Sequence, residues 1–275
     1  MNKNSLPVFT YGTLLPGMER EFALASATSL GPSLLEAVLF DLGPYPGIRE
    51  GAGQVVGELW EVDELTLQRL DAIEGHRDGD PAGSLFYRKE VDVRMFSNGS
   101  TVPAWSYFAR QEGGEPIEHG DYRRWRLEKG EKSQWLLSYG SNMGTSRLQR
   151  RVGELNEREQ GSLSGFELVL NKQSGVGSQA NAKANIRWRG GEASCPGVVD
   201  FLRIQQIQAL DPCEGAPHHY LRVAVQFQAT EWSAPRLVQT YIAHPNKLNE
   251  DLQPNEDYLQ HIQNGYEEFG FGEVS

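Results

Sequence analysis

Cysteine is scarce in this chain: its 275 residues include two, Cys195 and Cys213, so no disulfide framework is implied. No apolar run approaches the ~20 residues that a membrane-spanning helix requires. Residues 1–7 lack the apolar stretch and the small-residue cleavage site of a secretory signal peptide. These absences predict a cytoplasmic protein that does not enter a membrane.

Positive charge is also in deficit, with 26 basic against 37 acidic residues and a net charge of −11. Up to and including Lys132 there are 14 basic and 21 acidic residues, and after it 12 and 16. Neither half carries the basic stripe that phosphate contact requires, so we expect no nucleic-acid partner. An acidic surface would attract a cationic substrate, although solubility alone is the commoner reason for such a charge.

Signatures of bound groups are missing as well. The sequence has no CxxC, HExxH or phosphate-loop motif, so we expect neither a metal nor a cofactor. Hydrophobic residues make up 39% and charged residues 23%, which is typical of a globular protein rather than a disordered one.

An internal repeat is the most informative feature present. Residues 57–75 read GELWEVDELTLQRLDAIEG and residues 197–215 read GVVDFLRIQQIQALDPCEG; they align without a gap and share Leu-Asp-x-x-Glu-Gly. An early Tyr-Gly-Thr/Ser loop precedes each copy, and we match Tyr87 with Tyr220 after them. The repeat predicts one fold written twice, with domains at 1–131 and 132–275 joined near the charged segment 129–134.

Each copy has the same expected layout of short strands around one helix. This pattern predicts an α+β fold of two tandem small β-barrel domains, or strongly curved sheets, with short flanking helices. Residues 256–269 are expected to form a C-terminal packing helix. The expected strands are 7–11, 54–62, 87–96 and 101–108 in the first copy, and 134–139, 197–202, 220–229 and 236–242 in the second.

The two Tyr-Gly loops are candidate anion sites. A glycine after a strand lets the backbone turn sharply and expose successive N–H groups, which bind a carboxylate or an oxyanion. A single such glycine is more often only a turn, but its recurrence in both copies favours a function. The loops comprise Tyr11, Gly12, Thr13 and Leu14 in the first copy, and Tyr139, Gly140, Ser141 and Asn142 in the second.

Glu74 and Glu214 are the candidate acid–base residues. Asp63 is expected to cap the first helix and Gly75 to end it, so Glu74 would meet the negative end of the helix dipole among apolar neighbours. Both effects raise the pKa of a carboxyl group toward a value useful in proton transfer. In the second copy we expect Pro212 to end the helix before Glu214. Asp71 and Asp211 are interpreted as local capping or turn residues rather than as partners of these glutamates.

Ordered short motifs over nearly the whole chain resemble the γ-glutamylcyclotransferase family. The second copy resembles γ-glutamylcyclotransferases themselves, and the first resembles their smaller relatives that act on γ-glutamyl amines. The motifs are Tyr11–Leu14, Tyr45-Pro46-Gly47, Gly57-Glu58-Leu59 and Leu70–Gly75 in the first copy, and Tyr139–Asn142, Gly165–Leu168, Asn171-Lys172, Ala184-Asn185-Ile186, Pro196–Val199 and Leu210–Gly215 in the second.

The resemblance implies a reaction that needs no metal or cofactor. In this family the α-amine of a γ-glutamyl compound attacks its own γ-carbonyl, which releases 5-oxoproline and an amine or amino acid. Glu74 and Glu214 would transfer the protons, and the two loops would hold the glutamyl head and the oxyanion. Tyr87, Tyr220 and Asn185 would complete the substrate-binding set.

Several alternatives remain open at this stage. One is a non-catalytic sensor for a γ-glutamyl or amine metabolite, and another is a chain with only one active domain. Cys213 with His218 or His219 is a weak candidate for thiol chemistry, and the two histidines are a weak metal pair. Residues 76–86, longer than their counterpart, would form either a lid or an idle loop. The leaving group and the oligomeric state are left undetermined.

Overall fold

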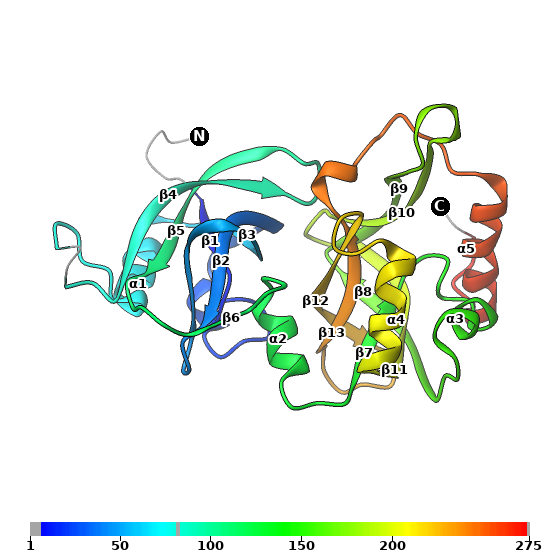
Figure 1. Ribbon diagram of the computed structural model, residues 1–275, viewed down its shortest axis with the longest axis horizontal. Helices are drawn as coiled ribbons and strands as arrows, with labels where there is room; N and C mark the ends of the chain where they lie inside the picture. Colours follow the sequence, from blue (N-terminus) through cyan, green and yellow to red (C-terminus); the bar gives the residue numbers. More distant parts are fainter. Residues whose placement is uncertain (1–6, 81–82, 274–275) are drawn as a thin grey trace. The chain divides into compact units, whose positions relative to one another are not determined.

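The computed structural model describes residues 7–80 and 83–273. The chain divides into two compact units, Met1–Trp125 and Arg126–Ser275 (Figure 1). The division falls inside helix α2 (Tyr122–Glu128), just before the expected linker. Most of the segment used for the signal-peptide prediction and two residues of the expected lid lie outside the described residues.

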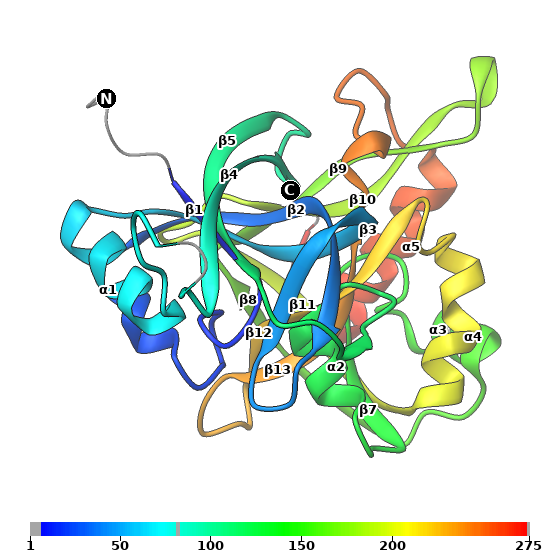
Figure 2. The same ribbon diagram turned by 60° about the vertical axis from the view of Figure 1, so that its left-hand side comes forward.

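Five strands of the N-terminal unit close into a barrel. The order around the barrel is β1, β3, β2, β4, β5 and back to β1, with antiparallel neighbours except for the parallel pair β5 and β1. The long strands β2 and β3 lie side by side in Figure 2. The strands are β1 (Val8–Thr10), β2 (Thr28–Asp41), β3 (Pro46–Glu61), β4 (Phe86–Met95) and β5 (Thr101–Ala109), with β6 (Glu115–Pro116) added to the end of β2.

The C-terminal unit repeats this closure. Its barrel order is β7, β11, β8, β12, β13 and back to β7, again with one parallel pair, β13 and β7. A separate hairpin of β9 and β10 leaves the barrel between β8 and β11. The strands are β7 (Ser133–Ser138), β8 (Glu157–Ser164), β9 (Phe166–Ser174), β10 (Asn181–Trp188), β11 (Ser194–Arg203), β12 (Tyr220–Ala229) and β13 (Arg236–Ala243).

Short helices flank each barrel. The N-terminal unit has the 3-10 turn η1 (Glu21–Leu24) and helix α1 (Glu64–Glu74). The C-terminal unit has α3 (Thr145–Val152), α4 (Ile204–Glu214), α5 (Glu256–Phe269) and the 3-10 turns η2 (Gly177–Gln179) and η3 (Pro245–Lys247). Both barrels thus share one closure order and one helix after the third barrel strand, which confirms the predicted fold class and the duplication.

Local sequence explains how the two equivalent helices α1 and α4 end. The Asp63 side chain accepts a hydrogen bond of 2.7 Å from the Thr66 N–H and caps the start of α1 as expected. Gly75 and Gly215 end the helices with φ of 65° and 66°, a left-handed conformation that glycine adopts at low cost. The prediction that Pro212 ends α4 before Glu214 was wrong. Proline in the last turn loses one backbone hydrogen bond but keeps a helical φ, so α4 continues through Glu214.

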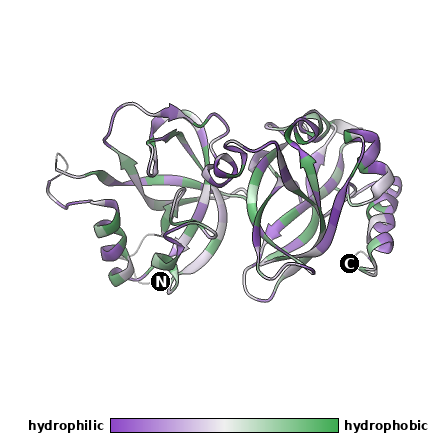
Figure 3. Ribbon diagram, turned by 90° about the horizontal axis from the view of Figure 1, so that it is seen from below, coloured by the Kyte–Doolittle hydropathy of each residue, from purple (hydrophilic) through white to green (hydrophobic). Residues whose placement is uncertain are grey.

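Each barrel packs its helix onto its own apolar core. In the N-terminal core Leu70 of α1 is fully buried beside Val8 and Trp60, with Leu67 and Ile73 packed at the edge. In the C-terminal core Ile207 and Leu210 of α4 are fully buried. Apolar stretches run along the strands of both units in Figure 3. This packing fixes the helix that ends at each candidate glutamate.

Candidate active sites

The two Tyr-Gly loops adopt the same tight turn. The Leu15 N–H donates to the Gly12 carbonyl at 3.0 Å, and the Met143 N–H donates to the Gly140 carbonyl at 3.0 Å. A side chain is not tolerated at either glycine, because a Cβ would lie 2.6 Å from Pro46 Cγ in the first loop and 2.8 Å from Ala184 Cβ in the second. Both positions therefore require glycine, because Pro46 or Ala184 packs closely against the loop.

Three consecutive N–H groups in each loop have no acceptor among the described residues. They belong to Gly12, Thr13 and Leu14 in the first loop, and to Gly140, Ser141 and Asn142 in the second. Consecutive N–H groups of this kind form a cradle for an anion. All six of these residues line pockets that also contain a candidate glutamate.

The loop tyrosines have a structural hydrogen bond in addition to their position in the pocket. The Tyr11 hydroxyl donates to the Tyr107 carbonyl at 2.6 Å, and the Tyr139 hydroxyl donates to the Tyr241 carbonyl at 2.5 Å. Each bond ties a loop to the last strand of its barrel. The rings of Tyr11 and Tyr139 line the pockets, but their hydroxyls are already engaged.

An Asp-Arg-Tyr group recurs beside each glutamate. Asp71 accepts from Arg88 Nη1 at 2.6 Å and from the Tyr107 hydroxyl at 2.7 Å. The interpretation of Asp71 as a local capping residue was therefore wrong: its carboxylate joins α1 to strands β4 and β5. Burial and the contact with Asp71 both raise the pKa of Tyr107, so its hydroxyl stays a donor.

The equivalent group in the second copy joins the same three residue types, with two hydrogen bonds from its arginine instead of one. Asp211 accepts from Arg222 Nε at 2.9 Å, from Arg222 Nη2 at 3.1 Å and from the Tyr241 hydroxyl at 2.7 Å. The local interpretation of Asp211 was wrong for the same reason. Since Asp71 and Asp211 lie three residues before the glutamates, these contacts fix the helix turn that carries each of them.

Glu74 stands in the N-terminal pocket without a hydrogen-bond or ion-pair partner among the described residues. Burial raises the pKa of its carboxyl group from 4.5 to about 7, and the nearby charge of Arg20 opposes this shift. This agrees with the expected desolvation. The N-terminal pocket is lined by Phe9, Thr10, Tyr11, Gly12, Thr13, Leu14, Arg20, Tyr45, Pro46, Ile73, Glu74, Leu85, Phe86 and Tyr107.

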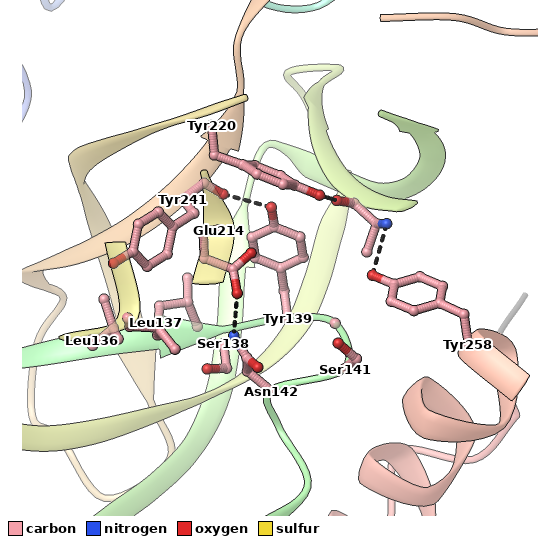
Figure 4. Close-up of a pocket in the computed structure, with 13 residues that line it drawn as sticks. Leu136, Leu137, Ser138, Tyr139, Ser141, Asn142, Glu214, Tyr220, Tyr241 and Tyr258 are labelled. Atoms are coloured by element: carbon pink, nitrogen blue, oxygen red, sulfur yellow. Dashed lines mark hydrogen bonds between the residues drawn. The ribbon is translucent and has the colours of Figure 1, made fainter. Parts of the chain in front are cut away.

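Glu214 stands in the C-terminal pocket with two partners on one oxygen. Its Oε1 accepts from Asn142 Nδ2 at 3.0 Å, as Figure 4 shows, and from Arg151 Nη1 at 2.7 Å. Arg151 also donates to the Asn142 side-chain oxygen at 3.0 Å, which closes a small network. The C-terminal pocket is lined by Leu136, Leu137, Ser138, Tyr139, Gly140, Ser141, Asn142, Ala184, Leu210, Glu214, Tyr220, Tyr241 and Tyr258.

Two predicted substrate-binding residues lie outside the pocket linings. Tyr87 was matched with Tyr220 by residue type, but the barrel registers pair Tyr220 with Ala243 and Phe86 with Ala109. Phe86 is thus the counterpart of Tyr220, and a shift of one residue along a strand places Tyr87 on the opposite face. Phe86 lines the N-terminal pocket, whereas its neighbour Tyr87 does not.

Asn185 is the second of these residues. Its side-chain oxygen accepts from the Ala243 N–H at 2.9 Å, and its Nδ2 donates to the Asn171 side-chain oxygen at 3.1 Å. It is almost fully buried, and it joins strand β10 to β13 next to the pocket residue Ala184.

Several residues in the pockets, or bonded to a pocket residue, were not predicted from the sequence. Arg20 follows its loop by several residues, and Arg151 lies 63 positions from its partner Glu214, so neither belongs to a short motif. Tyr107 and Tyr241 each stand two residues before an alanine, Ala109 or Ala243, in the region after the repeated segments, and this recurrence was a signal that could have identified them. The unpredicted pocket residues include Arg20, Tyr45, Phe86, Tyr107, Tyr241 and Tyr258.

The weaker alternatives receive little support from geometry. Cys213 is exposed, and its sulfur lies 3.9 Å from the Ala209 carbonyl rather than beside a histidine. Within residues 7–80 and 83–273, no group of three or more His, Cys, Asp or Glu side chains is placed to hold a metal ion. No helix in the same part of the chain is long and apolar enough to cross a membrane.

The fold and pockets together define a class: small duplicated barrels in which a cradle of backbone N–H groups shares a pocket with one glutamate. A family model described as γ-glutamyl cyclotransferase, AIG2-like, matches residues 8–124. The chain belongs to the γ-glutamylcyclotransferase family.

Three relatives align with part of this chain and most of their own. A candidate γ-glutamylcyclotransferase of Methanocaldococcus jannaschii is 33% identical over 123 residues, covering 43% of this chain and 97% of the relative. The γ-L-glutamyl-butirosin B γ-glutamyl cyclotransferase of Niallia circulans is 31% identical, covering 44% and 78%. The γ-glutamylcyclotransferase family protein YtfP of Escherichia coli K12 is 33% identical, covering 42% and 94%.

One solved structure matches both units in the same chain. YkqA of Bacillus subtilis superposes with a TM-score of 0.74 over 95% of this chain and 91% of its own, at 21% sequence identity. At this identity the likeness concerns the fold.

Proposed function

We propose that this protein is a γ-glutamyl cyclotransferase that releases 5-oxoproline from a γ-glutamyl amine or γ-glutamyl amino acid. Glu74 is the acid–base residue of the N-terminal pocket. The observation that carries the proposal is the combination of Glu74, with a pKa raised to about 7, and three open backbone N–H groups in the same pocket. A carboxyl group with a pKa near the working pH is well suited to accept and return a proton.

The proposed reaction joins two atoms of one substrate molecule. Glu74 takes a proton from the α-ammonium group, and the freed nitrogen attacks the γ-carbonyl carbon to close a five-membered lactam. The carbonyl oxygen gains negative charge, which the N–H groups of Gly12, Thr13 and Leu14 stabilise. The bond to the leaving nitrogen then breaks as the proton held by Glu74 passes to that nitrogen. The attacking nitrogen gives its second proton to the regenerated Glu74 carboxylate, which passes it to the released amine, so 5-oxoproline and a protonated amine result.

Positioning is expected to supply much of the acceleration, because nucleophile and electrophile belong to the same molecule. Well-oriented intramolecular reactions gain up to ~7–11 kcal/mol from this effect. Tyr45, Phe86 and Tyr107 give the pocket aromatic walls against which the glutamyl chain folds, and Arg20 offers a cationic group for the α-carboxylate. Loss of one oxyanion donor in comparable sites costs about 2.7–4 kcal/mol.

A second candidate function, ligand binding without turnover, applies to the C-terminal pocket. The ion pair between Arg151 and Glu214 favours it, since proton transfer by the bonded oxygen requires these contacts to be exchanged. If the C-terminal pocket only binds its ligand, the N-terminal domain is the one active domain of the chain. Glu214 Oε2 has no hydrogen-bond partner among the described residues, so Glu214 stays a candidate acid–base residue as well.

The test is a 5-oxoproline assay of the full chain against γ-glutamyl amines and γ-glutamyl dipeptides. The relative from Niallia circulans is named for γ-L-glutamyl-butirosin B, so this compound belongs in the panel. We expect product from at least one γ-glutamyl amine. Binding of several compounds without product from any would instead support a sensor.

A further inference from the structure

We propose that Lys172 and Lys183 are specificity-determining residues that make the C-terminal pocket select γ-glutamyl compounds with an acidic substituent. The pair would hold a carboxylate on the group attached to the γ-carbonyl. This inference rests on the proposed function for the γ-glutamyl head of the ligand, and it concerns binding rather than turnover.

The two lysines lie directly opposite each other on the β9–β10 hairpin. Lys172 Nζ lies 4.9 Å from the centre of the Tyr220 ring, and Lys183 Nζ lies 4.0 Å from the centre of the Tyr258 ring. Both tyrosines line the C-terminal pocket together with Glu214 (Figure 4). Each ammonium group therefore lies against the ring of a tyrosine that lines this pocket.

Neither lysine has a carboxylate partner among the described residues. This is unusual for Lys172, because only 5% of its surface is exposed. Like charges placed directly opposite on paired strands are unfavourable. Burial, together with the charges of Lys247 and Lys183, lowers the pKa of Lys172 to about 8, and the charge of Glu214 opposes this shift. A bound anion would relieve this repulsion.

Arg147 adds a third cation to the same region. Its Nε is buried without a hydrogen-bond partner in the described structure, and its charge acts on Lys183. The one carboxylate of the pocket, Glu214, is already bonded to Arg151. Three cationic side chains without a carboxylate partner among the described residues thus lie in this region, although residues after Lys132 include 16 acidic and 12 basic side chains.

The N-terminal pocket has neutral residues at the equivalent positions. Gly12 packs on Pro46 as Gly140 packs on Ala184, so the residues before these, Tyr45 and Lys183, correspond. Across the hairpin, the Leu42 N–H bonds to the Tyr45 carbonyl, whereas Lys172 pairs with Lys183. A leucine and a tyrosine in one copy are replaced by two lysines in the other. This exchange places two cations beside the C-terminal pocket that have no counterpart at the same positions of the N-terminal unit.

The test uses two ligands that differ by one carboxylate: γ-glutamylethylamine and γ-glutamyl-β-alanine. Binding to the full-length Glu74→Gln variant is measured by NMR after ¹³C-dimethylation of its lysines, which keeps their charge. We expect the Lys172 and Lys183 signals to shift with γ-glutamyl-β-alanine at concentrations at least about tenfold lower than with γ-glutamylethylamine, as for a charge-assisted contact.

Matched variants show whether the preference for the acidic ligand depends on the charges of Lys172 and Lys183. Lys172→Met and Lys183→Met together should reduce it to within about twofold when binding is followed by calorimetry, because the charge is lost but the apolar stem is kept. Arginine at both positions should preserve a preference. Lys89→Met is the control, because Lys89 is an exposed residue of the other unit that pairs with Glu50.

Two results would overturn the inference: equal affinity for the two ligands in the parent pocket, or a preference that survives the double methionine substitution. The proposed function is tested separately by 5-oxoproline release from γ-glutamylethylamine in the parent chain. If 5-oxoproline is released but the two ligands bind equally well, only the inference about the lysines is rejected. Charge-selective binding without release from any substrate removes only the proposed cyclisation.

Discussion

Arg151 Nη1 lies 2.7 Å from Glu214 Oε1, whereas the equivalent glutamate, Glu74, has no ion-pair partner among the described residues. The two copies share their barrel, their loop and their Asp-Arg-Tyr group, so this contact is a local difference within a common frame. Helix α3 supplies Arg151, and the N-terminal unit has only the short turn η1 in that part of its chain. The duplication has therefore left two similar pockets with different electrostatics.

The pH dependence of the N-terminal pocket should follow Glu74. A general base must be deprotonated in the free enzyme, so kcat/KM for a γ-glutamyl amine should rise with pH through about 7. The charge of Arg20 lowers the pKa of Glu74, so Arg20→Met should move this limb to higher pH. Initial rates of 5-oxoproline formation between pH 5 and 9 check both results, and an unmoved limb in the variant would contradict the coupling.

The raised pKa of Glu74 should also reduce stability at neutral and alkaline pH. Between about pH 4.5 and 7 the folded state holds a proton that the unfolded state has released, so the free energy of unfolding falls as pH rises. Glu74→Gln removes this dependence. The variant should therefore gain stability relative to the parent between pH 5 and pH 8, by at most about 3 kcal/mol. Urea denaturation of both proteins at the two pH values measures this, and a difference that does not change with pH would count against the assignment.

The Asp-Arg-Tyr groups are expected to contribute to stability. Tyr107→Phe and Tyr241→Phe each remove a 2.7 Å hydrogen bond to a partly buried carboxylate, at a cost of about 1–3 kcal/mol. Tyr266→Phe is a matched control, since the Tyr266 hydroxyl has no hydrogen-bond partner among the described residues. Thermal or urea unfolding checks the ranking; equal effects of all three substitutions would refute a specific role for these bonds.

The role of the Gly12 turn can be tested by adding a side chain at Gly12 and then shortening the residue that it would meet. Gly12→Ala would place a Cβ 2.6 Å from Pro46 Cγ, so the loop must shift and its N–H groups lose their alignment. We expect 5-oxoproline formation to fall about a hundredfold, as when an oxyanion donor is lost. Pro46→Ala in the same chain removes the clashing atom and leaves a Cβ 4.0 Å away, so activity should partly return. No recovery in the double variant would mean that the turn acts in another way.

Features encoded by local periodicity were predictable from the sequence. Helix α5 has the expected bounds of 256–269, and strand β12 those of 220–229. Strand β2 was missed because Thr28–Asp41 contains Gly31-Pro32 and a nearly continuous apolar run, which hides the alternation of a strand. The loop and glutamate of each copy share a pocket, and they could be singled out because both recur at matching places; their catalytic role stays a prediction.

Relationships that depend on register or on distant contacts were not predictable in this way. Matching Tyr87 to Tyr220 by residue type shifted the alignment by one position, and only the strand pairing shows that Phe86 is the counterpart. The pairing of Arg151 with Glu214 and of Lys172 with Lys183 depends on where folded segments meet. No spacing rule in one sequence specifies such contacts.

The most direct test of the central claim is the initial rate of 5-oxoproline release from a γ-glutamyl amine that the parent converts. The rate is measured for the parent, for Glu74→Gln, for Glu214→Gln and for the double variant. Glutamine keeps the size of glutamate but cannot exchange the proton. We predict that Glu74→Gln lowers the rate at least about a hundredfold and that Glu214→Gln retains most of it. A Glu74→Gln variant that releases 5-oxoproline at the parent rate would contradict the account.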